Sequence, residues 1–408
     1  LLARVLGLAQ VDVQPAGQGG KVALQYLGHR DAQAVREQIL LAVSIRAKRD
    51  LADTAPETAT TDPRAQGVAG PLDERLRDLA DVAIAAAALE AGTVVKVPLG
   101  RLIASILLGS EMLTLVIIAA GIVIMSVLVS PAILATGLPL ALVFIGVVIG
   151  QFNRGFNFVL SRAADGVRVG AGLTATTTET IPFGRIHAVE AQQPLGWRPF
   201  GWWKVRITTA GHSLSQGGQN RLQNMVLPVG QLDDVLRVFE TLLHEGETGS
   251  AEREAALAQA LTGPGDGFLK SGPRAGWLLW CATRRTGLRI ELAELSPHTQ
   301  QSSLRIRRGW FTRSLSVMPM VRAQSVQLSR PMVHRLLGLA SLQVHTVLGP
   351  VRMQMRGFAL ADAREAFTLL ATTIVRVQQQ DAAERLHALR PSTPTPDRLA
   401  DEQHGGSL

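Results

Sequence analysis

Residues 181–211 read IPFGRIHAVEAQQPLGWRPFGWWKVRITTAG, and residues 318–349 read MPMVRAQSVQLSRPMVHRLLGLASLQVHTVLG. With Pro182 placed on Pro319, the two stretches align without a gap as far as a shared glycine. The positions that recur are arginine, proline, arginine and glycine: Arg185 and Arg322, Pro194 and Pro331, Arg198 and Arg335, Gly201 and Gly338. Because this repeat is much longer than a solenoid unit, it predicts one small domain used more than once.

The first residues of the chain, LLARVLGLAQVDVQPAG, resemble the end of the same repeat. Arg4 and Gly7 take the places of Arg198 and Gly201. We therefore expect residues 1–49 to be the truncated second half of a further domain, in a chain whose start is clipped. This half-domain should contain two strands and one helix, at residues 8–13, 21–27 and 31–49.

A second feature is an apolar stretch over residues 102–153, in which Glu111 is the only charged residue. A membrane-spanning helix needs roughly 20 apolar residues. Residues 112–130 and 131–150 each have about that length and meet at a Ser-Pro step. Two such helices joined by so short a turn must be antiparallel, so the sequence predicts a transmembrane helical hairpin over residues 102–150. The alternative is a pair of buried core helices, although apolar runs of this length are rare in soluble domains.

Basic residues flank the apolar stretch on both sides and are absent from its middle: Lys96, Arg101, Arg154, Arg162 and Arg168. The positive-inside rule therefore places both ends of the hairpin in the cytoplasm. Glu111 has two interpretations. It could be an intramembrane functional acid, or it could mark the cytoplasmic end of the first helix, which its position favours.

Both full copies of the repeat contain several short strand-like segments followed by one amphipathic helix, which is an α+β arrangement. The helices are expected over residues 231–244 and 360–377, where apolar residues recur at helical spacing. The predicted division of the remaining chain is a linker at 50–73, the second domain at 151–245, a linker at 246–275, the third domain at 276–379 and a disordered tail at 380–408.

The composition narrows the possible function classes. The chain of 408 residues is 47% hydrophobic and 18% charged, with a formal net charge of +8. That charge suits an anionic partner, either a membrane surface or a nucleic acid. The one cysteine, Cys281, excludes an internal disulfide and a thiolate metal site. No HExxH, GxSxG or Walker motif occurs, so the sequence predicts no catalytic residues, no metal and no cofactor.

The strongest candidate for a binding site is WRPFGWWK, which begins at Trp197 and ends at Lys204. Its three tryptophans, including Trp202 and Trp203, could sit at a membrane interface, where Trp prefers the headgroup level. Arg198 and Lys204 would then meet anionic lipid. The alternative is a turn entering a strand, with the aromatic residues packed in the core. Aliphatic residues at the matching places of the other copies favour that alternative in part.

The repeated arginines also have two interpretations. Arg185, Arg322 and Arg335 could hold a phosphate or a carboxylate of a partner, or they could hydrogen-bond turn carbonyls within their own domain. Their presence in both copies favours the structural role. Four further arginines surround Gly309 and predict a solvated basic hairpin: Arg305, Arg307, Arg308 and Arg313.

Taken together, these motifs resemble the bacterial PH domain of the YdbT-like membrane proteins. The resemblance rests on Phe156-Asn157-Phe158, Asp165-Gly166, Gly172-Leu173, Ile181-Pro182, Arg185-Ile186 and residues 197–211. It implies tandem pleckstrin-homology-like β-barrels, each with a C-terminal helix, that alternate with transmembrane hairpins. It implies no enzyme activity and no agreed ligand. The third copy departs from the pattern, because Val347-Leu348-Gly349 stands in place of an Ala-Gly ending.

These features predict a non-catalytic, multi-pass inner-membrane protein whose PH-like domains lie in the cytoplasm and act as scaffold or as lipid- or protein-binding modules. The expected partners are the lipid bilayer, anionic lipid headgroups or another membrane protein. One alternative is an accessory component of an export or envelope-stress-resistance system. Another is a membrane-tethered nucleic-acid binder, against which the scattered placement of the basic residues argues.

Overall fold

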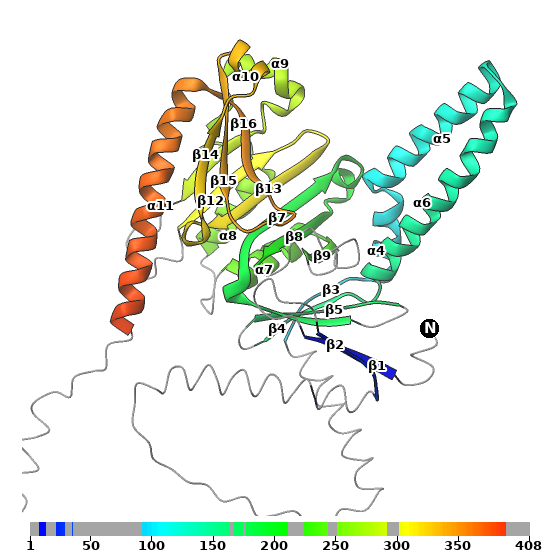
Figure 1. Cartoon of the computed structure of the whole chain (residues 1–408), viewed down its shortest axis with the longest axis horizontal. Coiled ribbons are helices and arrows are strands. Elements are labelled where there is room, and N and C mark those ends of the chain that lie inside the picture. The colour runs from blue at the N-terminus through cyan, green and yellow to red at the C-terminus, as the bar shows by residue number, and fades with distance from the viewer. Residues whose placement is uncertain are drawn as a thin grey trace, which may run out of the picture. The chain divides into compact units, whose positions relative to one another are not determined.

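The computed structural model divides the chain into two compact units that follow each other in sequence (Figure 1). The structure describes residues 8–13, 22–28, 35, 92–163, 166–173, 177–210, 224–243, 251–291 and 302–388. Unit 1 holds most of the described residues up to Ala258, and unit 2 holds most of those from Gln259 onward. Both units combine antiparallel strands with helices, so the predicted mixture of α and β structure is confirmed.

The first sheet of unit 1 has four antiparallel strands, in the order β3 (Thr93–Lys96), β4 (Val159–Ala163), β5 (Gly166–Ala171) and β6 (Thr177–Pro182). Val167 and Val169 of β5 and Ile181 of β6 are buried, as alternation along the strands requires for one face. β3 and β4 are neighbours in this sheet, although three helices separate them in the sequence. The helices are therefore an insertion between two paired strands.

The rest of unit 1 contains three more antiparallel strands and a closing helix: β7 (Ile186–Pro194), β8 (Trp203–Thr209), β9 (Met225–Gly230) and α7 (Leu232–Leu243). Two short 3-10 helices, η2 (Phe183–Arg185) and η3 (Leu195–Phe200), precede β7 and β8. One face of α7 is buried, and its core residues are Val235, Leu236, Val238, Phe239 and Leu242. This apolar face is the one predicted from the helical spacing.

The inserted helices are α4 (Leu99–Leu107), α5 (Ser110–Leu128) and α6 (Leu134–Gly155), with the 3-10 turn η1 (Pro131–Ile133) before α6. The chain reverses at η1, so α5 and α6 lie side by side (Figure 1). The reversal occurs at the predicted place. Residues 102–107, however, were expected in the hairpin and instead belong to the separate helix α4, because the backbone is extended at Gly109.

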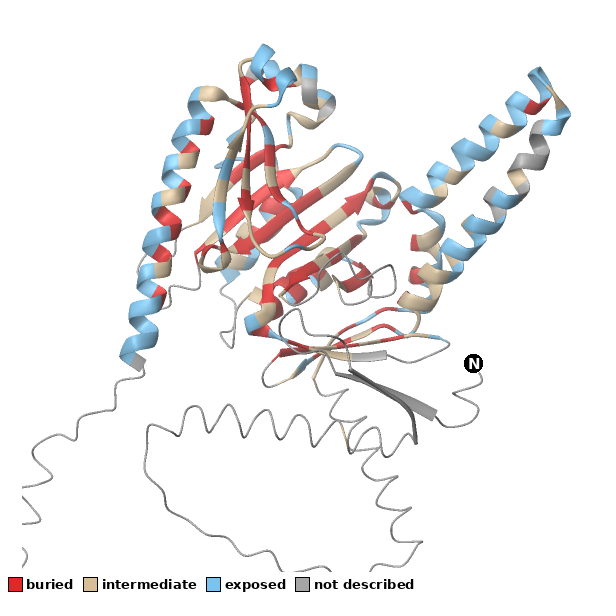
Figure 2. Ribbon diagram, viewed as in Figure 1, coloured by how far each residue is buried: buried red, intermediate tan, exposed pale blue. Residues whose placement is uncertain are grey.

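The surface of α5 is apolar and exposed (Figure 2). The segment Leu99–Leu128, which comprises α4 and α5, is long and apolar enough to cross a membrane, and it is most apolar over an 18-residue window. Only 6% of that window is buried, so the helix is not a core helix of unit 1. In the described side chains of α6, Leu142–Gly155 forms a shorter apolar segment.

Unit 2 has its own four-stranded and three-stranded antiparallel sets. The first set is β10 (Leu269–Lys270), β11 (Gly287–Glu291), β12 (Ser303–Arg308) and β13 (Thr312–Pro319). The second set is β14 (Ser325–Ser329), β15 (Leu339–His345) and β16 (Met353–Ala359), followed by helix α11 (Leu360–Ala388). The 3-10 turn η8 (Met320–Arg322) and helix α10 (Met332–Leu336) precede β14 and β15.

The two aligned sequence stretches form the same elements in the same order. Each has a 3-10 turn after its first proline, then a strand, a short helical turn and a second strand. The shared glycine ends the helical turn in both units, with φ of 65° at Gly201 and 67° at Gly338. Glycine adopts this left-handed conformation at little cost, which explains why it recurs at this position.

Two predicted domain boundaries are wrong. β3 pairs with β4, so the second domain begins before the helices rather than at residue 151. β10 pairs with β11, so residues 269–275 belong to the third domain rather than to a linker, and α8 (Ala251–Thr262) fills much of the same predicted linker. Strands of four and two residues are too short for the sequence pattern to show that they pair.

Helix α11 continues to Ala388, eleven residues past the predicted end, so residues 380–388 are helical rather than a disordered tail. The strands β1 (Leu8–Val13) and β2 (Val22–Gly28) form an antiparallel pair, close to the predicted ranges. The predicted helix at 31–49, the linker at 50–73 and the tail beyond residue 388 lie outside the described residues, apart from residue 35.

The basic hairpin around Gly309 is not solvated as predicted. Arg305 and Arg307 are both buried. Arg305 pairs with Glu291, and the guanidinium of Arg307 lies 5.2 Å from the centre of the Phe268 ring and donates to the Gly263 carbonyl at 2.5 Å. Residues 263–268 therefore cover the outer face of β12, which the sequence had assigned to solvent.

Candidate functional site

Helix α4 connects β3 to the apolar helix α5 and is held on the body of unit 1 by Trp197. Trp197 lies in η3 and is buried, and its indole Nε1 donates to the Ser105 carbonyl of α4 at 2.9 Å. A methyl group at Gly196 would come within 2.5 Å of the Leu108 carbonyl, so η3 approaches the end of α4 closely. Ser105 is buried at this contact, and Leu102 of α4 is also buried, with its side chain close to Gly155 of α6.

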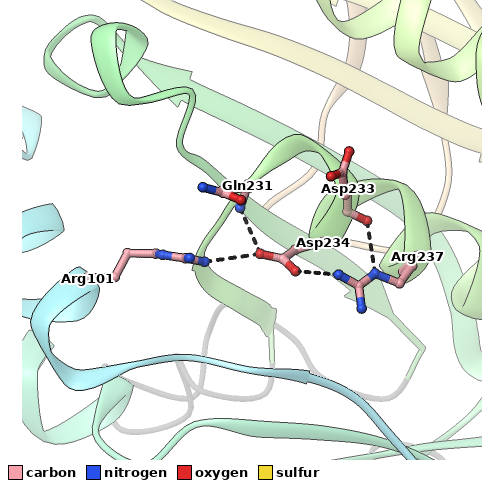
Figure 3. A network of polar contacts seen from close by, with 5 residues as sticks. All are labelled: Arg101, Gln231, Asp233, Asp234 and Arg237. Carbon is pink, nitrogen blue, oxygen red and sulfur yellow. Dashed lines mark hydrogen bonds and ion pairs between the residues drawn. The ribbon is translucent and has the colours of Figure 1, made fainter.

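A second contact holds the start of α4 (Figure 3). Asp234 lies in the first turn of α7, where its Oδ2 accepts from the Gln231 backbone N–H at 2.9 Å. The same oxygen pairs with Arg101 Nη1 of α4 at 3.2 Å, and Oδ1 pairs with Arg237 Nη2 at 3.0 Å. One carboxylate thus caps α7 and fixes α4 to it. Since α4 leads into α5, the closing helix of unit 1 is linked to the apolar helices through this residue.

The structure divides the predicted WRPFGWWK site into a core part and a surface part. Trp197 and Trp203 are buried, as the packing interpretation expected. Phe200 and Trp202 form a stacked pair with ring centroids 4.7 Å apart, and Phe200 is 49% exposed. The pair lies at the end of η3, whose Gly196 approaches Leu108 at the end of α4 closely. Arg198 is half-buried in η3.

Lys204 follows this pair on β8 and is half-buried. Burial lowers the pKa of the Lys204 ammonium, and the charge of Arg206 lowers it further, whereas Glu111 and Glu190 act in the opposite direction. Glu111 is exposed in the first turn of α5, which agrees with its predicted role as a marker of a helix end. Lys204 and Glu111 are therefore close enough to interact electrostatically, and the aromatic pair lies just before Lys204 in the sequence.

Each repeated arginine has contacts within its own unit. Arg185 and Arg322 end the 3-10 turns η2 and η8, where their backbone carbonyls accept from Ala210 N and Thr346 Oγ1 at 2.9 and 3.1 Å. The exposed Arg335 donates through Nε to the Arg330 carbonyl at 3.0 Å. Arg335 thus makes the kind of bond to a turn carbonyl that the structural interpretation predicts. The contacts described for Arg185 and Arg322 involve their backbone, so the role of their guanidinium groups stays a prediction.

The sequence analysis did not single out Ser105 or Asp234, and it used Arg101 only as a flanking charge. The sequence does contain a signal for Asp234. It stands three positions after Gln231, at the start of an apolar helix pattern, where an acidic side chain can reach back to the N-cap. The partner Arg101 could not be found this way, since it lies 133 positions earlier, in the inserted helix α4. Within the described part of the chain, no group of three or more His, Cys, Asp or Glu side chains could hold a metal.

A family model described as "Bacterial PH domain" matches residues 80–246 and 277–373, which is more than half of the chain. The chain belongs to the bacterial PH domain family. The first matched stretch includes β3 as well as α4, α5 and α6, so the inserted helices lie inside the span of a bacterial PH domain. No curated protein matches the chain.

Membership in the bacterial PH domain family fits the four-plus-three strand sets and the closing helix of each unit. It identifies the protein as a binding or scaffold module, since PH domains commonly bind lipids or proteins and are generally not catalytic. A binding module of this family is expected to act through an exposed surface rather than through a reaction centre. Among the described residues of unit 1, one such surface includes the exposed Phe200 and the neighbouring Trp202.

Proposed function

We propose that this bacterial PH domain protein is a membrane-anchored, non-catalytic binding module of the YdbT-like type. In this proposal, α5 and α6 form a transmembrane hairpin, and the PH-like domains are tandem barrels that lie on the cytoplasmic side. Residues 1–49 are the second half of a further domain of the same kind. The ligands are anionic lipid headgroups or a second membrane protein.

The observation that carries the proposal is the exposed apolar surface of Leu99–Leu128, of which only 6% is buried in the most apolar window. Exposing so large an apolar area to water would be unfavourable at about 25 cal/mol for each Å². Lipid acyl chains remove that cost, and the length of α5 suits the hydrocarbon core of a bilayer.

The groups at the end of α5 support an interface at that level. Phe200 and Trp202 stack at the end of η3, the turn that approaches the end of α4, and tryptophan prefers the headgroup region of a membrane. Lys204 lies near Glu111 at the same end. We therefore propose Phe200, Trp202, Arg198 and Lys204 as lipid-contacting residues. Trp197 and Trp203 have a different role, because they are buried and hold the fold.

Helix α4 is a rigid connection between the PH-like domain and the proposed membrane helices. It is fixed to α7 through Arg101 and to η3 through Ser105, so the PH-like domain and the membrane helices move together. A ligand that binds the body of unit 1 would therefore be held at a defined distance from the bilayer. This is what a scaffold at a membrane surface requires.

Cysteine labelling tests the hairpin. In a Cys281→Ser background, Pro131→Cys should react with a membrane-impermeant maleimide added outside the cell, because η1 lies at the far end of the hairpin. Arg154→Cys should react only in inverted vesicles. Labelling of both positions from the same side would overturn the hairpin.

The two alternatives from the sequence are tested in the same membranes. An accessory role in export or stress resistance predicts a membrane protein that co-purifies stoichiometrically and protects α5 from crosslinking to lipid. A nucleic-acid role predicts salt-dependent binding to DNA stronger than binding to anionic vesicles. Neither alternative gains support from a contact in the described part of the chain.

A further inference from the structure

The segment between β10 and β11 occupies the same place in unit 2 as the apolar helices occupy in unit 1. In unit 1, β3 pairs with β4, and α4 to α6 lie between them in the sequence. In unit 2, β10 pairs with β11, and residues 271–286 lie between them. This shorter segment contains η5 (Pro273–Ala275), α9 (Gly276–Leu279) and η6 (Trp280–Ala282).

The segment exposes two tryptophans. Trp277 is 88% exposed and Trp280 is 86% exposed, which is unusual for the largest apolar side chain. Trp280 also has a φ of 49°, a left-handed conformation that costs a non-glycine residue free energy. The backbone thus holds the large apolar side chain of Trp280 in an outward position, where contact with water is unfavourable.

Helix α10 extends the same exposed surface. Its Met332 and Leu336 are 79% and 78% exposed. A methyl group at Gly338, just after α10, would lie 3.4 Å from Nη1 of Arg274 in the segment, and Figure 1 shows α9 and α10 together at one end of the unit. We call residues 271–286 and 332–336 the unit 2 tip.

Helix α10 is also the counterpart of η3, since Pro331 aligns with Pro194. In unit 1, Trp197 of η3 donates to the backbone of α4. In unit 2, His334 stands at the position of Trp197 and is buried, and neither ring nitrogen has a partner in the described structure. Among the described residues, His334 therefore makes no hydrogen bond like the one that joins Trp197 to α4.

The charge of the tip is positive. Residues 271–286 contain three arginines and no acidic residue, and α10 adds Arg335. Arg274, Arg284 and Arg335 are exposed. An apolar, tryptophan-rich surface with a basic rim is complementary to a membrane with anionic headgroups.

We propose that the unit 2 tip is a second membrane-contact surface that binds anionic lipid, with Trp277 and Trp280 at the headgroup level. It is a monotopic counterpart of the hairpin inserted at the same place in unit 1. The segment is far too short to span a bilayer, which needs roughly 20 apolar residues, but it can bury its side chains in the interface. The inference rests on the proposed function insofar as the hairpin keeps the bilayer within reach.

A lipid surface accounts for the features of the tip better than a helix of another protein. A docked helix would need a continuous apolar groove, whereas the exposed residues stand on two short helical turns. Two tryptophans on a turn, with arginines beside them, match the aromatic and basic anchors that membranes select. If the tip binds a protein instead of lipid, a probe at Cys281 should remain unquenched in lipid discs.

The experiment uses the full chain in lipid nanodiscs. The chain has one cysteine, Cys281, so a polarity-sensitive fluorophore can be placed in the tip without changing any residue. Discs are made from phosphatidylcholine alone or mixed with phosphatidylglycerol, with bromine atoms near the headgroup end of the acyl chains. We expect roughly a twofold loss of emission in the anionic discs, because tryptophans at the headgroup level would bring the probe to that depth.

Three variants make the result specific to the tip. Trp277→Ser combined with Trp280→Ser should abolish the quenching, and Arg274→Ala combined with Arg284→Ala should remove its dependence on phosphatidylglycerol. Leu369→Ser combined with Val375→Ser, two exposed apolar residues of α11, is the matched control and should leave quenching unchanged. Circular dichroism should show equal folding in all of them, since every changed residue is exposed.

The readouts separate the two proposals. Retention of the chain in discs after detergent removal reports on the hairpin, and quenching at Cys281 reports on the tip. A retained chain with an unquenched probe overturns the lipid-binding tip and leaves the hairpin standing. Quenching that persists in the Trp277→Ser and Trp280→Ser variant also overturns it. A chain that is not retained and not quenched overturns both.

Discussion

Arg101 and Asp234 are separated by 133 positions in the sequence, yet Nη1 of the arginine lies 3.2 Å from Oδ2 of the aspartate. The same oxygen accepts from the Gln231 N–H at the start of α7. The side chain of Asp234 therefore connects α7, the closing helix of a PH-like domain, to α4, which lies far away in the sequence. Through α4 it is also connected to the apolar helix α5.

Replacing Asp234 should weaken both connections. We expect Asp234→Ala to lower the free energy of unfolding of unit 1 by about 1–2 kcal/mol, because it removes the cap of α7 and leaves Arg101 without this partner. A double-mutant cycle with Arg101→Ala in denaturant unfolding should give a coupling energy of roughly 0.5–1 kcal/mol. Asp233→Ala is the control, since Asp233 is the exposed acidic neighbour in the same helical turn. A coupling energy near zero would show that α4 is not held by this pair.

Trp197 is predicted to hold α4 through its indole N–H. Trp197→Phe keeps a ring in the core but removes the donor to the Ser105 carbonyl, so we expect a loss of about 1 kcal/mol. Trp197→Ala should cost about 3–5 kcal/mol because it also leaves a cavity. Hydrogen exchange in nanodiscs would report the local effect. Amides of α4 should exchange faster in Trp197→Phe, whereas those of β5 should not change.

The two equivalent glycines should respond alike to substitution. Gly201→Ala and Gly338→Ala each force an L-residue into the left-handed region, at a cost of about 1 kcal/mol. Gly184→Ala is the matched control, because a methyl group there meets no atom and its backbone has no positive φ. Thermal unfolding would measure all three. Unequal effects at Gly201 and Gly338 would contradict the structural repeat.

Glu179 should make unit 1 less stable as the pH rises. Burial raises the pKa of this carboxyl to about 7, above its ordinary value of 4.5, because it shares the core-facing side of β6 with Ile181. The folded state therefore keeps the proton that the unfolded state releases, so stability is greatest below pH 4.5 and falls until about pH 7. Glu179→Gln should remove this dependence and add up to about 3 kcal/mol above that range.

Urea unfolding across this pH range measures the effect. The exposed carboxyl of Glu252 provides the comparison, and Glu252→Gln should leave the pH profile as it is in the unmodified chain. A Glu179→Gln profile with the same slope as the unmodified chain would mean that Glu179 is hydrated in the folded protein.

The sequence was sufficient for elements that carry a strong local signal. The helix α7 follows from apolar spacing, the reversal at Pro131 from a Ser-Pro step between apolar runs, and the recurring glycines from one gapless alignment. In each case a single stretch of chain determines the outcome. The prediction failed where the partner is distant, because no periodicity reports that β3 pairs with β4 across three helices.

The candidate site shows the same division. An aromatic-rich stretch could be recognised, but which tryptophans are buried depends on the approach of α4 to η3, and that is a tertiary contact. Arg305 and Arg307 were assigned to solvent because charged residues usually are exposed. Residues 263–268, which the sequence pattern assigns to a linker, fold back over Arg307, and Arg305 pairs with Glu291 of the neighbouring strand β11.

The insertion of α4, α5 and α6 between β3 and β4 also sets the order of events during synthesis. β3 leaves the ribosome first, and its sheet partner β4 emerges only after both apolar helices have been made. Contacts between segments so far apart form slowly, and unpaired strand edges are prone to aggregate while they wait. If the helices enter the bilayer as they emerge, the membrane brings β3 and β4 together at its surface. Membrane insertion would then be the step that closes the first sheet of unit 1. In a chain synthesised without a bilayer, the pairing of β3 with β4 should therefore be the first structural element to fail.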